Sequence, residues 1–143
     1  MVGAKVLLVD DEADFTEVLA SRMQTRGLEV EIAGSGPEAI QKAQGRQFDA
    51  VILDLAMPGM DGIETLKRLL ALNPDLQVIL LTGHATVQKG IEAVKSGAVE
   101  FLEKPASLEL LLEKIEKAQT DRLESAERRV ADEINDILRS KGW

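Results

Sequence analysis

Short apolar segments of strand length alternate along this chain with segments whose apolar residues recur at the spacing of an α-helix. A weaker run, at residues 28–33, alternates apolar and polar side chains. The other four runs, at residues 6–9, 51–53, 78–81 and 99–102, are largely apolar. A helical pattern follows each of the five runs. The sequence therefore predicts an α/β domain with a doubly wound parallel sheet, covered by helices on both faces.

Composition narrows the class of protein. The 143 residues are 45% hydrophobic, which is typical of one globular domain, and no apolar run approaches the length of a membrane span. The chain has no cysteine and no signal-peptide pattern, so we expect a cytoplasmic protein without membrane partners. The net charge of -8 argues against direct binding to nucleic acid. With a single histidine, any metal should be a hard cation bound by oxygen ligands.

Reactive side chains stand where the predicted strands end. Asp10 and Asp11 follow the first strand, Asp54 follows the third, Thr82 ends the fourth, and Lys104 follows the fifth. The carboxyl ends of the strands line one edge of a doubly wound sheet, where the ligand site lies. Taken singly, each aspartate could be a turn former or open a helix, and the lysine could be solvated. Their occurrence at four strand ends predicts a common site.

This set of groups suits phosphoryl transfer to a carboxylate. Three carboxylates without a histidine or thiol partner favour Mg²⁺, which would offset the repulsion between the neighbouring acids. The same ion would neutralise charge on an incoming phosphoryl group. Asp54 is the best candidate nucleophile because it ends the expected central strand. Lys104 could pair with the phosphoryl oxygens, and the Thr82 hydroxyl could hydrogen-bond the attached group.

The chain resembles the receiver domains of two-component response regulators over about residues 4–120. The resemblance rests on four motifs in order, LLVDDE, DLAMPGMDG, LLTGHA and FLEKPAS. It implies a flavodoxin-like five-stranded sheet of order 2-1-3-4-5, and transfer of phosphoryl to Asp54 from a phosphohistidine of a sensor kinase. It also implies that Asp11, Asp54 and the Ala56 backbone carbonyl ligate Mg²⁺, while Asp10 acts mainly through water.

The resemblance further implies a conformational switch. Thr82 would move toward the phosphoryl group and Phe101 would turn inward, changing the face formed by the fourth helix, fifth strand and fifth helix. Phe101 could instead be an ordinary core aromatic. Pro105 would follow a cis peptide bond that aims the preceding lysine into the site. In this family the positions of Ala56 and His84 tune the lifetime of the phosphoryl group, although His84 could simply be a solvated loop residue.

The expected receiver occupies residues 1–120, and residues 121–143 should form a helical extension or linker. No glycine or proline interrupts the sequence between Ser107 and Gly142, so the last helix could run to about Arg139. Its sparse apolar stripe predicts a modest homodimer. The chain would be either a stand-alone receiver or part of a longer regulator.

The predicted function is that of a phosphorylation-activated signalling switch. A sensor histidine kinase or phosphotransfer protein would be the donor, and a downstream protein or a missing output domain would be the target. Such a domain is not an enzyme but catalyses its own phosphorylation and dephosphorylation. A metal-dependent phosphohydrolase with an aspartyl nucleophile is an alternative, although Ala56 stands where such enzymes place a general acid. A phosphorylation-independent interaction module is the other alternative.

Overall fold

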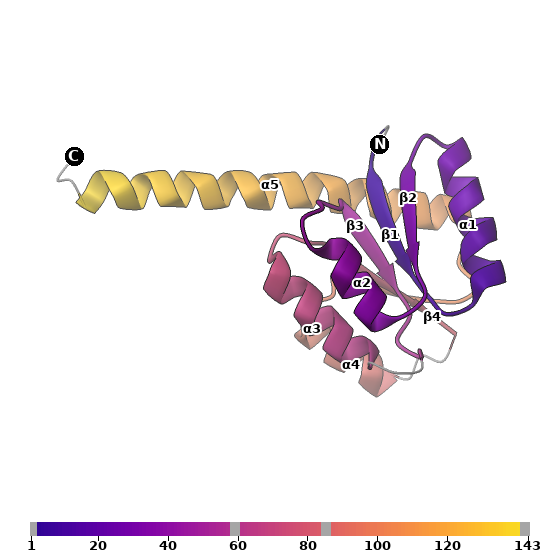
Figure 1. The fold of residues 1–143 in the computed structure, drawn as a ribbon. Helices are drawn as coiled ribbons and strands as arrows, with labels where there is room; N and C mark the ends of the chain where they lie inside the picture. The colour runs from indigo at the N-terminus through magenta and orange to yellow at the C-terminus, as the bar shows by residue number, and fades with distance from the viewer. Residues whose placement is uncertain (1–2, 58–60, 84–86, 141–143) are drawn as a thin grey trace.

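The computed structural model describes residues 3–57, 61–83 and 87–140 (Figure 1). It contains one parallel sheet of five strands in the order β2-β1-β3-β4-β5, which confirms the predicted fold class and strand order. The strands are β1 (Lys5–Val9), β2 (Glu29–Ala33), β3 (Ala50–Leu53), β4 (Val78–Thr82) and β5 (Glu100–Glu103). The helices are α1 (Ala13–Thr25), α2 (Gly36–Ala43), α3 (Gly62–Leu72), α4 (Val87–Lys95) and α5 (Leu108–Ser140).

The helices cover both faces of the sheet, as the nearly continuous apolar runs of the inner strands require. On one face, α2, α3 and α4 pack over one set of buried strand residues, and on the other face α1 and α5 pack over the alternate set (Figure 1). In the inner strands, side chains such as Leu7, Leu53 and Ile79 are completely buried. A sheet buried in this way has a fixed register, because a slip of one residue would exchange the two faces.

Side-chain caps begin two of the helices where the sequence places serines. Ser35 accepts a hydrogen bond from the backbone N–H of Glu38 at 3.2 Å, and Ser107 accepts one from Leu110 at 3.1 Å. After α1 the chain turns at Gly27, which has a φ of +89°, a conformation that glycine adopts without strain. These local signals fix where two helices begin and where the chain turns back into β2.

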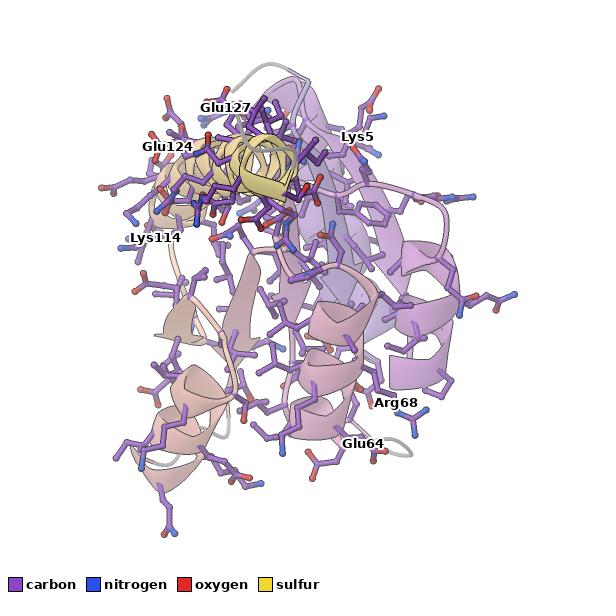
Figure 2. The ribbon with its side chains drawn as sticks, turned by 90° about the vertical axis from the view of Figure 1, so that its left-hand side faces the viewer. Lys5, Glu64, Arg68, Lys114, Glu124 and Glu127 are labelled. Carbon is purple, nitrogen blue, oxygen red and sulfur yellow. The ribbon has the colours of Figure 1, made fainter. Side chains whose placement is uncertain are left out.

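The last helix is much longer than the domain it covers. α5 runs without interruption for 33 residues, and its carboxyl-terminal half extends away from the sheet (Figure 1). Figure 2 looks along this extension, where Glu124 and Glu127 point away from the sheet. Two arginines of the extension, Arg122 and Arg129, form ion pairs with aspartates of the domain. None of the described helices is long and apolar enough to cross a membrane.

Candidate functional site

Two buried carboxylates lie side by side at the carboxyl edge of the sheet. The parallel ladders continue past the strand ends, since the N–H of Asp10 donates to Ala33 and the N–H of Asp54 donates to Val9. Asp10 and Asp54 are only 5% and 4% exposed. In each, one oxygen is held by the backbone N–H two residues ahead, from Glu12 at 2.9 Å and from Ala56 at 3.1 Å. Both carboxylates are therefore fixed in orientation.

Lys104 enters this edge from the loop between β5 and α5. Its backbone N–H donates to the carbonyl of Thr82 at 3.0 Å, which continues the pairing of β4 with β5. The Lys104–Pro105 peptide bond is cis, the isomer that the resemblance to receiver domains implies. The side chain is only 14% exposed, so the ammonium lies inside the site rather than in solvent.

Three acids surround the Lys104 ammonium. Its Nζ lies 2.6 Å from Oδ2 of Asp10, 3.5 Å from Oε1 of Glu12 and 3.8 Å from Oδ2 of Asp54. The shortest contact has the geometry of a charge-assisted hydrogen bond. The ammonium is therefore held mainly by Asp10, with Asp54 close enough for electrostatic attraction.

Burial and ion pairing shift the pKa values of these groups in opposite directions. Burial raises the pKa of Asp10 above its ordinary value, and the hydrogen bond from Lys104 only partly offsets this effect. Burial alone would lower the pKa of Lys104, but its ion pairs with Asp10, Asp54 and Glu12 raise it. The lysine thus stays charged, and its positive charge balances part of the negative charge of the cluster.

Carboxylate oxygens of Asp10, Glu12 and Asp54 lie within 4.8 Å of one another, a spacing that a single cation could bridge. An all-oxygen donor set of this kind fits Mg²⁺. Asp11, which the sequence analysis expected to be a direct ligand, is exposed and does not belong to this cluster. The third carboxylate of the cluster belongs to Glu12, whose side chain is 64% exposed and which sequence reasoning did not assign to the site. The available signal was a third acid directly after the aspartate pair.

The remaining predicted residues occupy different surroundings. Thr82 is completely buried at the end of β4. Phe101 is half-buried and packs against α4, where a Cβ on Gly90 would lie 3.5 Å from the Phe101 ring. Ala56 is exposed at the edge of the site. His84 lies outside the described residues.

Sequence reasoning also missed Phe15, which is half-buried at the margin of the buried face of α1. The Lys104 ammonium lies over its ring, 4.2 Å from the centroid. The sequence shows Phe15 only as one member of a helical apolar stripe. Its contact with the lysine depends on residues 89 positions apart in the chain and has no local signal.

A cavity of about 510 Å³ in the described part of the chain lies away from this site. It lies beside β2 and is lined by charged groups that already pair with each other, Lys5 with Glu29 and Arg46 with Glu31. The buried acids and the lysine at the carboxyl edge therefore form the better candidate for chemistry.

Comparison with known proteins agrees with this assignment. A family model described as "Response regulator receiver domain" matches residues 6–116. The transcriptional regulatory protein ZraR of Escherichia coli O157:H7 is 38% identical over 113 residues, which are 79% of this chain but 26% of ZraR. The chain thus spans about a quarter of the length of this curated relative.

Two solved structures are similar over most of the chain. A CheY-like response regulator receiver domain protein from Methanospirillum hungatei JF-1 has a TM-score of 0.82 at 28% identity, covering 86% of this chain and 98% of that chain. A response regulator from Burkholderia pseudomallei with a phosphorylated aspartic acid, calcium ion and citrate has a TM-score of 0.76 at 28% identity, covering 97% and 86%.

Proposed function

The chain belongs to the family of response regulator receiver domains, and we propose that Asp54 is the residue that accepts the phosphoryl group. A receiver domain is a signalling phosphoacceptor rather than an enzyme for an external substrate. The observation that carries the proposal is the pairing of a buried carboxylate with a buried ammonium, Oδ2 of Asp54 with Nζ of Lys104 at 3.8 Å. A phosphorylated aspartic acid in the similar Burkholderia structure supports the same chemistry.

In the proposed reaction, an oxygen of Asp54 attacks the phosphorus atom of a phosphohistidine on a sensor kinase or phosphotransfer protein. The new P–O bond forms as the P–N bond breaks, and the imidazole nitrogen retains the electron pair and takes up a proton. Lys104 balances charge on the phosphoryl oxygens, and the Thr82 hydroxyl hydrogen-bonds the attached group. In a separate hydrolysis step, water attacks the phosphorus as the P–O bond to Asp54 breaks. Inorganic phosphate leaves with the protons of the water, and Asp54 is again a free carboxylate.

Mg²⁺ is the proposed cofactor, because the converging donors are all oxygen atoms. The ligands proposed from the resemblance are Asp11, Asp54 and the backbone carbonyl of Ala56, with Asp10 acting through water. Glu12 is the competing candidate for the position of Asp11, since its carboxylate lies in the observed cluster. When bound, the ion supplies positive charge that lowers the cost of bringing a phosphoryl group to three acids.

Intact-mass analysis after incubation with acetyl phosphate and Mg²⁺ tests the assignment of Asp54. One phosphoryl mass should be added to the unmodified chain, and Asp54→Asn should prevent the addition. Asp14→Asn, an exposed aspartate in the first turn of α1, is the matched control and should be labelled normally. Labelling of Asp54→Asn at the normal rate would exclude Asp54 as the acceptor.

We further propose that phosphorylation moves Thr82 toward the phosphoryl group and Phe101 into the space that it leaves. The packing of Phe101 beside Gly90 of α4 supports a link between this movement and the face formed by α4, β5 and α5. His84 is proposed, with Ala56, to set the lifetime of the phosphoryl group. His84→Ala should therefore change the rate of phosphoryl loss and leave the rate of attachment unchanged, as time courses of the labelled protein would show.

The extension at residues 121–143 is proposed to associate with a second copy of the chain. Leu123, Val130 and Ile137 are exposed at intervals of seven residues, and Ile134 lies beside them. Ending the chain near Thr120 should leave a receiver that can be phosphorylated but lower the apparent mass in sedimentation. Monomeric behaviour of both lengths at high micromolar concentration would leave the extension as a linker to an output domain. We also propose that the protein is located in the cytoplasm.

A further inference from the structure

The Lys104 ammonium also has an uncharged aromatic neighbour in the site. It lies 4.2 Å from the centre of the Phe15 ring, within the distance at which a cation is attracted to the negative face of an aromatic ring. We propose that Phe15 is a positioning residue, whose ring holds the Lys104 ammonium beside Asp54. This inference rests on the proposed role of Asp54 as phosphoacceptor.

The Phe15 ring packs against the margin of the core cluster on this face of the sheet, so core packing accounts for only part of its position. The residues of α1 that are buried against the sheet are Thr16, Leu19, Ala20 and Met23, whereas Phe15 is only half-buried at the margin of that face. A narrow cavity of about 10 Å³ lies beside the ring and is also lined by Asp10 and Asp54. The ring is therefore not fixed by close packing on every side. The ammonium is the charged group that it contacts.

The uncharged character of this partner matters for the reaction. Asp10 binds the ammonium at 2.6 Å and draws it away from Asp54, which lies at 3.8 Å. A lysine side chain has a flexible stem of four carbons, so one hydrogen bond still leaves the ammonium considerable freedom to move. Another carboxylate would restrain the ammonium but would also repel the incoming phosphoryl group, since three acids are already present. An aromatic face restrains the cation without adding net negative charge.

The test compares three replacements of this ring. Phe15→Leu keeps an apolar side chain but removes the aromatic face, and should slow labelling by acetyl phosphate about three- to tenfold. Phe15→Tyr keeps the face and should restore the normal rate. Pentafluorophenylalanine at position 15 keeps the shape but reverses the charge distribution of the ring, so it should be as slow as leucine. Phe48→Leu, which removes a ring from the opposite side of the sheet, should be labelled normally.

Two further measurements separate positioning from general packing. The methylene protons next to the Lys104 ammonium should show an upfield ring-current shift by NMR, absent in Phe15→Leu and assigned by their loss in Lys104→Arg. In a Lys104→Met background, Phe15→Leu should slow labelling no further, because its effect acts through the ammonium.

Equal slowing in both backgrounds, a normal rate with the fluorinated ring, or the absence of the upfield shift would overturn the inference. Each of these outcomes is compatible with Asp54 as the acceptor. Failure of the proposed function would instead appear as normal labelling of Asp54→Asn.

Discussion

Arg122 should contribute more to stability than the other arginines of the α5 extension. Its guanidinium holds Oδ1 of Asp49 through two contacts, 2.9 Å from Nε and 2.8 Å from Nη2. The other oxygen of Asp49 accepts the backbone N–H of Lys5 at 2.9 Å. The pair is largely buried, with the arginine side chain 16% exposed. Arg122→Ala would leave a buried carboxylate with one remaining hydrogen bond.

The loss of folding stability expected from Arg122→Ala follows from this burial. Removing one partner of a fully buried ion pair typically costs about 3–5 kcal/mol, and water can reach Asp49 once the arginine is shortened, so we expect about 2–3 kcal/mol. Arg129 also binds a carboxylate, that of Asp75, but its side chain is 48% exposed. Arg129→Ala should therefore cost less than about 1 kcal/mol. Arg128→Ala, at an exposed neighbouring position, should cost close to nothing.

Urea unfolding followed by far-ultraviolet circular dichroism measures these three costs on the same helix. For a chain of this size, about 2–3 kcal/mol corresponds to a fall of roughly 5–10 °C in the thermal midpoint. Asp49→Asn should be milder than Arg122→Ala, because the amide oxygen can still accept hydrogen bonds from Lys5 and Arg122, although the guanidinium loses its charged partner. The reasoning is refuted if Arg122→Ala is no more costly than Arg129→Ala, since the extension would then not be docked on Asp49.

Three further results are expected. Millimolar Mg²⁺ should raise the thermal midpoint by relieving repulsion among the acids, and Asp11→Ala should blunt this rise. A rise blunted by Glu12→Ala instead would assign the ligand position to Glu12, and equal rises in all three proteins would indicate a nonspecific ion effect. Gly62→Ala should lower the free energy of unfolding by about 1–3 kcal/mol in urea, because its Cβ would lie 2.5 Å from the Cα of Leu55. Burial alone would lower the pKa of Lys104, but its acidic partners raise this pKa above the ordinary value of 10.5. The stability that the charged lysine contributes should therefore be complete below pH 10.5 and be lost as the pH rises through the folded pKa. Unfolding midpoints of the unmodified chain and Lys104→Met, compared across this range, should therefore converge at high pH.

The fold could be predicted because its signals are local. An apolar run such as Val78–Leu81 identifies a strand covered on both faces, and a cap such as Ser35 marks the start of a helix. Once five strands alternate with five helices, the parallel sheet brings the strand ends to one edge. This argument was enough to bring Asp10, Asp54 and Lys104 together.

The finer arrangement of the site could not be predicted in the same way. Three consecutive acids follow β1, and the direction in which each side chain points depends on how the turn into α1 is bonded. Here the N–H of Glu12 bonds to Asp10, and the Glu12 carboxylate reaches Lys104 while Asp11 is exposed. The ring of Phe15, in the first turn of α1, lies beneath the Lys104 ammonium. Such contacts join distant segments and leave no periodic pattern in the sequence.

The carboxyl ends and the amino ends of the strands carry different groups of functional contacts. The carboxyl ends of β3 and β4 carry Asp54 and Thr82, while the loops that precede these strands carry Asp49 and Asp75, to which the extension of α5 is bound. Any partner that binds the extension is therefore held in a defined direction relative to the strands that carry the site. Since the two sets of contacts share no side chain, they should be separable by mutation. Arg122→Ala should loosen the extension while labelling continues, and the substitutions at Phe15 should slow labelling while the extension stays docked.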